Sequence, residues 1–304
     1  MGRPRESLAA PSGIDALLLI IAVTGVSFSG PLMAAVAAPP LAIAYWRNAL
    51  GAAVTTTFAA VRDGRRLLRP TGRSWRLSML AGVALAMHFG TWVPSLTMTS
   101  VASAVALVST QTVFAALIAH LLGRRLPGLA WVGIITATVA VGLITGADVT
   151  LSARAVAGDL LAVIGGLCAA IYVTIGSAAR TRLTTASYTA ICYTICALLL
   201  LAVCLVGGVR LAGYTANSWL KIALVTVCAQ LLGHTLINVT LRSTSPTVVS
   251  MVILLEVPGA ALIALVWLHQ RPPASAVPGL VLLLVGLFLV ARSRGREVPV
   301  EATE

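Results

Sequence analysis

The sequence predicts an all-α integral membrane protein with ten transmembrane helices, arranged as two inverted five-helix repeats. The first observation is composition: 59% of the residues are hydrophobic and 10% are charged, with a mean hydropathy of +0.98, whereas soluble domains carry about 25% charged residues. The second is the presence of long runs without charge, such as 16–46 and 77–119. Hydrocarbon offers backbone groups no water, so these runs are predicted to be helices that satisfy their own hydrogen bonds.

The third observation is internal repetition. Asp15 recurs 144 residues later as Asp159, and the dipeptide at 74–75 recurs at the same offset at 218–219 as Ser-Trp. Each of these matches opens an apolar span. The chain is therefore predicted to be a tandem duplication.

Each half of the chain holds five predicted spans. Proline and glycine residues fall between them, as at 39–40 and 127–128, where they favour loops. Because five is odd, the halves enter the bilayer in opposite senses, which is the usual architecture of a transporter. We expect the first repeat at 1–150 and the second, with a short cytoplasmic tail, at 151–304. The spans are predicted at 14–36, 40–61, 75–96, 101–122, 128–147, 156–177, 187–207, 218–240, 246–268 and 276–292.

The placement of basic residues predicts the orientation, because these residues stay on the cytoplasmic side of short loops. With both termini inside, sixteen basic residues are cytoplasmic and four are external, namely Arg154, Arg210, Lys221 and Arg271. We expect a multi-pass protein of the cell (plasma or inner) membrane with both termini cytoplasmic. The net charge of +12 follows from this topology, so no nucleic-acid partner is predicted.

Catalytic motifs are missing from the sequence. It has no H-E-x-x-H, no Ser-Lys dyad and no G-x-x-x-x-G-K stretch, so we predict no enzyme activity, no cofactor and no metal site. The text at 27–30 and 146–148 resembles intramembrane protease motifs only superficially, and we interpret it as helix packing and loop. A cleaved signal peptide is rejected, because it would remove Asp15 from its match with Asp159.

Two charged side chains lie inside predicted spans. Arg47 is several residues into the second span, and Glu256 is ten residues into the ninth. A charge at the bilayer centre costs about 2.5 to 3.5 kcal/mol on insertion scales, so we expect both to face a cavity or a partner. The alternatives are that Arg47 snorkels to the outer headgroups and that Glu256 is a protonated, hydrogen-bonded core carboxyl.

Neutral polar residues extend this set. His88 and Trp92 lie one turn apart on the third predicted span, and Gln230, His234 and Asn238 form an i, i+4, i+8 stripe on the eighth. Histidines in both halves favour a shared central cavity, although a lone histidine in a membrane helix is often an interhelical hydrogen-bonder. The hydroxyl-rich part of the fourth span is in register with the acidic part of the ninth. The predicted substrate-binding residues are Arg47, His88, Trp92, Gln111, Tyr172, His234, Asn238 and Glu256.

These residues resemble the EamA type of the drug/metabolite transporter superfamily, over nearly the whole chain. Arg47 matches the family's arginine in the second helix, and Pro258 matches its proline midway along the ninth. Thr112 stands where the family usually has proline, and Gly123 and His269 stand near positions where it often has glutamate. The resemblance implies a ten-helix inverted repeat that exports small metabolites, often amino acids, by alternating access. The family's glycines in helices five and ten are matched by Gly133, Gly142, Gly279 and Gly286, and we expect these small residues to let the two helices approach other helices closely.

We therefore expect a transporter of small polar or amphipathic, amino-acid-like metabolites. Arg47 can hold a carboxylate through a bidentate fork and Glu256 can accept an ammonium group, so a zwitterion suits the site. Desolvation favours the protonated carboxyl, so Glu256 is also the candidate for proton coupling. The rival interpretation is that Arg47 and Glu256 pair with each other, or with backbone carbonyls, as structural polar contacts.

The expected partners are a small-molecule substrate, the lipid bilayer and protons as coupling ion. The sequence is also compatible with a homodimer. The sequence leaves two other classes of function open: a membrane-embedded lipid-modifying enzyme, and a non-transporting membrane receptor or scaffold. Neither accounts for an inverted repeat.

Overall fold

Every regular element in the described part of the chain is a helix. The computed structural model describes residues 12–64, 72–123, 125–149, 152–179, 183–233, 236–237, 240, 249 and 252–293. The elements are α1 (Gly13–Ser27), α2 (Ser29–Ala34), α3 (Pro40–Asp63), α4 (Gly72–Ser95), α5 (Val101–Val108), α6 (Gln111–Leu121), α7 (Gly128–Val149), α8 (Ala153–Ala179), α9 (Thr185–Val206), α10 (Ala216–Val225), the π-helix η2 (Thr226–Gly233), α13 (Glu256–Trp267), the 3₁₀-helix η3 (Ala274–Ala276) and α14 (Val277–Ser293).

Among these residues, eight helical segments are long and apolar enough to cross a membrane. Large apolar side chains such as Ile135, Leu160 and Val281 are exposed on their outer faces, as expected of a surface that contacts lipid. The chain is therefore a multi-pass membrane protein. The segments are Gly13–Ala34, Gly72–Ser95, Val101–Leu121, Gly128–Ala147, Ala153–Ala179, Thr185–Val206, Ala216–Gly233 and Ala274–Ser293.

Two predicted spans are not among the eight. α3 is 24 residues long but carries Arg47, Arg62 and Asp63, which lower its hydropathy. α13 has only 12 residues, and half of residues 246–255, the part of the predicted ninth span that precedes it, lies outside the described residues. The total of ten spans thus stays a prediction.

Hydroxyl side chains fix where several helices begin. Ser100 accepts a hydrogen bond from the backbone N–H of Ser103 (3.0 Å), and Thr215 accepts one from Ser218 (3.2 Å), which satisfies donors that a helix start leaves unpaired. α4 and α10 both begin two residues before the serine of the recurring Ser-Trp dipeptide. The repeated sequence therefore occupies the same place in two equivalent helices.

Two spans that were expected to be continuous are interrupted. The first breaks at Phe28, between α1 and α2, and the fourth breaks between α5 and α6. At the second break Ser109 Oγ donates to the carbonyl of Val105 (2.8 Å) and Thr110 Oγ1 to that of Leu107 (2.6 Å). The same two carbonyls also accept backbone hydrogen bonds from the N–H groups of Ser109 (3.3 Å) and Thr110 (3.2 Å), so the hydroxyls add a second bond to each at the break.

The break in the fourth span has a counterpart in the second half. α6 begins at Gln111 after the turn at 109–110, and α13 begins at Glu256 after a turn at 254–255. The two segments also end alike: Gly123 has φ 89° and His269 has φ 53°. Glu256 and Gln111 therefore open equivalent half-helices.

The eighth span changes character at Thr226, where α10 becomes the π-helix η2. α1 approaches this segment closely, because a Cβ added to Gly25 would lie 2.6 Å from the carbonyl oxygen of Cys228. π-helical turns are rare and often occur at functional sites. η2 carries Gln230 into the interior of the protein, where this side chain is buried.

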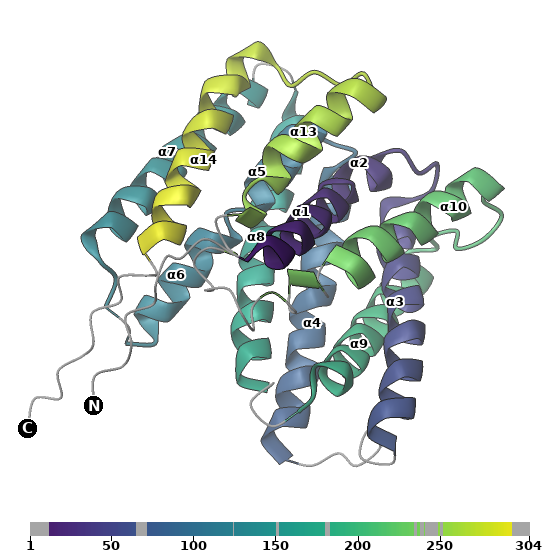
Figure 1. Ribbon diagram of the computed structural model, residues 1–304. Helices are drawn as coiled ribbons and strands as arrows, with labels where there is room; N and C mark the ends of the chain where they lie inside the picture. Colours follow the sequence, from purple (N-terminus) through teal and green to yellow (C-terminus); the bar gives the residue numbers. More distant parts are fainter. Residues whose placement is uncertain are drawn as a thin grey trace, which may run out of the picture.

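The most extensive helix contacts are α4 with α8, α7 with α14, and α3 with α9. Figure 1 shows α7 and α14 side by side at one edge of the bundle, with α3 at the opposite edge. α7 and α14 run antiparallel, because Gly133 faces Val290 whereas Gly279 faces Ile144. The sequence-based prediction of close packing holds for Gly133, Gly279 and Gly286 but is wrong for Gly142, which has no neighbouring atom within 4 Å of an added Cβ.

α3 and α9 also run antiparallel. Asp63 at the end of α3 accepts hydrogen bonds from Thr184 and Ser187 at the start of α9. Thr184 is the N-cap of α9 and Ser187 is in its first turn. The Asp63 carboxylate therefore joins the end of α3 to the start of α9 on one side of the molecule. In the predicted numbering of spans these are the second and the seventh, which are equivalents in the two repeats.

Candidate functional site

Arg47 is the largest fully buried side chain of the described residues, with 2% of its surface exposed. Its Nε donates to Oε1 of Gln230 at 3.1 Å, and its Nη1 donates to Oγ of Ser29 at 3.1 Å and to Sδ of Met33 at 3.5 Å. Because the guanidinium lies in the interior, Arg47 does not snorkel to the headgroups. Its hydrogen-bond partners are all neutral.

The ring of Phe89 lies against the guanidinium, with Cζ of Arg47 4.4 Å from the ring centroid. Phe89 belongs to α4, which puts a cation–π contact on the side of Arg47 that faces the third predicted span. A contact of this type can be worth about 2 kcal/mol when it is desolvated. Arg47, which belongs to α3, is thus held by three other elements: α2, η2 and α4.

Gln230 is the partner that positions Arg47 most directly. It is 3% exposed, and its Nε2 has no hydrogen-bond partner in the described part of the chain. This amide nitrogen lies against α3, because a Cβ added to Gly51 would be 2.4 Å from it. A buried amide N–H of this kind is a donor available to a ligand.

Glu256 lies close enough to Arg47 to interact with it electrostatically, but among the described residues the only ion pair within 4.0 Å joins Arg62 and Asp63. α1 positions Glu256, because Gly259, one turn later in α13, packs against Oγ of Ser27. Glu256 is in the first turn of α13, where the helix dipole favours a carboxylate. Arg47 and Glu256 therefore form no salt bridge within 4.0 Å in the described residues, whereas the broader rival interpretation of structural polar contacts stays a prediction.

Tyrosines of α8 and α9 lie near one another, and one of them, Tyr193, lies near Arg47. The rings of Tyr172 and Tyr188 are stacked, with centroids 6.5 Å apart, and Tyr193 interacts electrostatically both with Tyr172 and with Arg47. Cys196, one turn after Cys192, also lies near Arg47. Tyr172 is thereby connected to the Arg47 site through Tyr193.

His88 and Trp92 lie on the α4 side of the site. Nδ1 of His88 is 2.9 Å from the carbonyl oxygen of Gly165 in α8, and its ring stacks on Trp92 with centroids 5.4 Å apart. Trp92 is buried, and its Nε1 has no hydrogen-bond partner within the described residues. In this structure His88 is an interhelical contact, the alternative that the sequence left open.

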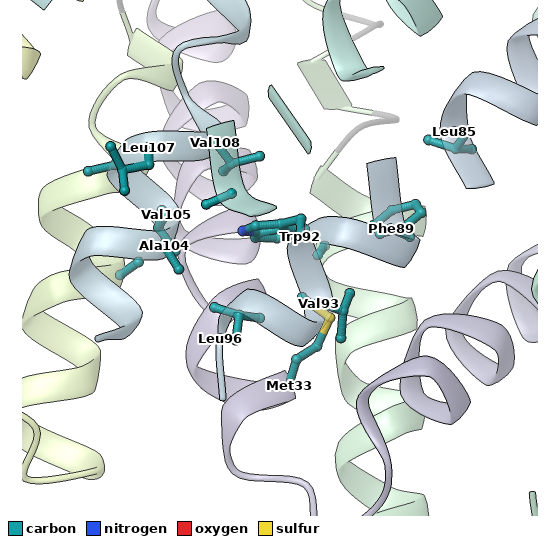
Figure 2. Close-up of a cluster of buried hydrophobic side chains, with 14 of the residues drawn as sticks. Met33, Leu85, Phe89, Trp92, Val93, Leu96, Ala104, Val105, Leu107 and Val108 are labelled. Atoms are coloured by element: carbon teal, nitrogen blue, oxygen red, sulfur yellow. The ribbon is translucent and has the colours of Figure 1, made fainter. Parts of the chain in front are cut away.

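Trp92 is packed among apolar side chains, as Figure 2 shows, with Val93, Val105 and Val108 around it and Phe89 nearby. Phe89 is the link to Arg47, because the centroids of Phe89 and Trp92 are 6.3 Å apart. The predicted residues His88 and Trp92 are therefore joined to Arg47 through an aromatic side chain that the sequence did not single out.

The remaining predicted residues have separate outcomes. Gln111 opens α6 and lies next to Gly166 of α8. His234 and Asn238 lie outside the described residues.

Three side chains of the site were missed. The sequence pattern at 27–30 predicts helix packing, yet Ser29 accepts a hydrogen bond from Arg47. Gln230 was noted only as part of a stripe, and Tyr193 not at all. Two features of the sequence point to this region. One is the glycine at 51, which makes room for Gln230, and the other is an arginine that has no acidic residue near it in its own predicted span.

These features define a class: a multi-pass helical membrane protein with a buried cationic site among broken and π-helical segments. No group of three or more His, Cys, Asp or Glu that could hold a metal occurs in the described residues. The chain belongs to the EamA-like transporter family, whose model matches residues 13–146 and again 156–292. The two matches also show the internal duplication, while the boundaries 1–150 and 151–304 stay a prediction.

A solved structure shares this fold. The crystal structure of another protein superimposes with a TM-score of 0.65, covering 94% of this chain and 99% of that chain at 18% sequence identity. At this identity the likeness concerns the fold alone. No curated protein sequence matches the chain significantly.

Proposed function

We propose that this protein exports small amino-acid-like metabolites across the cell membrane by alternating access, as a ten-helix inverted repeat with both termini in the cytoplasm. Membership of the EamA-like transporter family supports transport as the activity of this protein. The observation that carries the substrate class is Arg47, a buried cation with neutral hydrogen-bond partners and a carboxyl group nearby.

Two antiparallel helix pairs support the inverted architecture. α7 and α14 are the last helices of the two matched repeats, and α3 and α9 are the second of each, and the members of both pairs run in opposite directions. Equivalent helices that cross the membrane in opposite senses are what an inverted repeat requires. The ten spans of this proposal are the eight apolar segments with α3 and the span that contains α13.

The chemistry of the site favours a substrate that carries a carboxylate. The guanidinium makes hydrogen bonds through Nε and Nη1, which leaves Nη2 for a ligand, and the amide Nε2 of Gln230 lies on the same side chain that binds Arg47. Charge-assisted bonds of this type are roughly twice as strong as neutral ones. Glu256, in electrostatic range of Arg47, can accept the ammonium group of the same molecule.

Ligands that differ by one charged group test this assignment. Purified protein in proteoliposomes would be assayed by solid-supported membrane currents with amino acids, the corresponding amino-acid amides and the N-acetylated amino acids. We expect currents with the free amino acids only, and their loss in Arg47→Gln. Arg210→Gln is the matched control, because Arg210 is exposed and lies in a loop after α9. Currents of equal size with free amino acids and amides would overturn the role of Arg47 as the carboxylate site.

A further inference from the structure

A recess of about 430 Å³ opens between the ends of α6, α8 and α14, away from Arg47. Its walls include Ala115 and Ala119 of α6, Thr174 and Ser177 of α8, and Ser293 at the end of α14. This volume is within the range of about 300 to 1,000 Å³ that is typical of ligand sites. None of the residues that surround Arg47 contributes to it.

The recess has an apolar part and a hydroxyl part. Small apolar side chains of α6 leave room between the helices for a flexible hydrocarbon chain. The hydroxyls of Thr174, Ser177 and Ser293 donate to helix carbonyls at 2.8, 2.8 and 2.7 Å, so their oxygens can accept hydrogen bonds from a ligand. A molecule with an acyl chain and a glycerol-type headgroup matches both parts.

Two basic residues are immediate sequence neighbours of residues that line the recess. Arg125 directly precedes the lining residues Leu126 and Pro127, and Arg292 directly precedes Ser293. Both arginines are exposed, and neither has a carboxylate within 4.0 Å among the described residues. Three more arginines, at 124, 180 and 182, adjoin the lining in sequence and lie outside those residues.

We propose that this recess binds an anionic phospholipid, with an acyl chain between α6 and α8 and the phosphate at Arg125 and Arg292. Basic pockets between transmembrane helices bind anionic headgroups in this way. The site does not depend on the transport proposal, because it shares no residue with the Arg47 site.

Native mass spectrometry of the full-length protein in detergent tests the proposal. Phosphatidylglycerol and phosphatidylcholine with identical acyl chains would be titrated separately. We expect phosphatidylglycerol to bind preferentially, and its affinity to fall on the order of tenfold in Arg125→Gln/Arg292→Gln, since surface basic residues contribute additively to anionic lipid binding. Arg73→Gln/Arg76→Gln is the matched control, because both arginines are exposed on α4 and do not line the recess.

A second variant separates the acyl chain from the headgroup. Ala115→Phe keeps every charge but fills the recess, so it should also weaken phosphatidylglycerol binding, whereas Ala202→Phe on the open face of α9 should not. If the double arginine variant is not monodisperse, the comparison of Ala115→Phe with Ala202→Phe tests the proposal in its place. Equal binding of the two lipids, or equal losses in the α4 control pair, would overturn the proposal. Binding of glycerol 3-phosphate as strong as that of the lipid would overturn it in favour of a soluble phosphate ligand.

Discussion

At the scale of single residues, the side chains that contact Arg47 are uncharged, and this feature distinguishes a binding site from a structural ion pair. A buried charge is usually compensated by an opposite charge, because an unpaired one is costly. Here the partners within bonding distance are an amide, a hydroxyl, a thioether and an aromatic ring. The guanidinium therefore keeps most of its capacity to attract an anion.

Glu256→Gln separates proton coupling from a structural role. The substitution keeps the shape of the side chain and removes the group that can take up a proton, so we expect transport to continue while its dependence on pH disappears. The measurement is the substrate current in proteoliposomes across a range of pH values. Asp15→Asn is the control, because Asp15 lies beside the cap of α1, and it should leave the pH profile unchanged. A Glu256→Gln protein with the native rate and the native pH profile would show that the carboxyl is structural.

Gly51→Ala should damage the site without changing any charge. The added methyl would lie 2.4 Å from Nε2 and 2.9 Å from Cδ of Gln230, so the end of the glutamine side chain must shift, and we expect its bond to Arg47 to weaken or break. Hydrogen bonds to charged groups contribute about 1.5 to 3 kcal/mol, so substrate affinity should fall roughly tenfold or more.

The control for this substitution is Gly142→Ala, which meets no atom within 4 Å. It should keep native affinity and a melting temperature at or above that of the native protein, since alanine favours helix over glycine. Native affinity in a monodisperse Gly51→Ala protein would contradict the positioning role of Gln230.

The charged residues of the site could be predicted from the sequence, whereas most of its neutral residues could not. Arg47 and Glu256 could be predicted because a charge inside an apolar run is rare and costly. Serine, glutamine and tyrosine are common in membrane helices, where they bond to neighbouring carbonyls, so nothing in the sequence distinguishes Ser29 or Tyr193 from packing residues. Only the fold brings them to Arg47.

At the scale of helices, the pairing of α7 with α14 depends on glycine. A Cβ on Gly286 would lie 2.6 Å from the backbone nitrogen of Ala137, and one on Gly133 would lie 2.7 Å from the carbonyl oxygen of Gly286. Backbone atoms cannot turn aside as a flexible side chain can. The close approach therefore requires the absence of a side chain.

Gly133→Leu and Gly286→Leu should each lower the yield of monodisperse protein in detergent, because leucine forces the two helices apart. Size-exclusion chromatography of the purified variants measures the effect. Gly142→Leu, on the same helix but in open space, should behave as the native protein does. Equal tolerance at all three positions would contradict the packing argument.

Helix positions could be predicted from the sequence better than helix interruptions. Prolines and glycines placed the loops, since they end or prevent regular structure. The breaks at Phe28 and at 109–110 occur within predicted apolar spans, and at 109–110 two hydroxyls donate to carbonyls of the preceding helix. The π-helical turn at η2 is similarly hidden, and the close approach of α1 to this segment becomes visible only in the fold.

At the scale of the whole molecule, the predicted orientation can be tested by labelling single cysteines. All five native cysteines would first be replaced, and a cysteine would then be introduced at Arg73 or at Arg210, both of which are exposed. A membrane-impermeant maleimide added to intact cells should label Arg210→Cys, and label Arg73→Cys only after permeabilisation. The opposite pattern would reverse the topology.

The three most extensive helix pairs, α4 with α8, α7 with α14 and α3 with α9, each combine one helix from either side of the 150–151 boundary. The repeats are therefore units of descent rather than units of folding, since a half released from its partner would expose the faces that those pairs bury. Each half completes the other's interior, as subunits do in an obligate two-fold dimer. The peptide connection between them mainly raises their effective concentration. Residues 1–150 and 151–304, produced as separate chains in one cell, should therefore assemble together, and either one alone should be degraded.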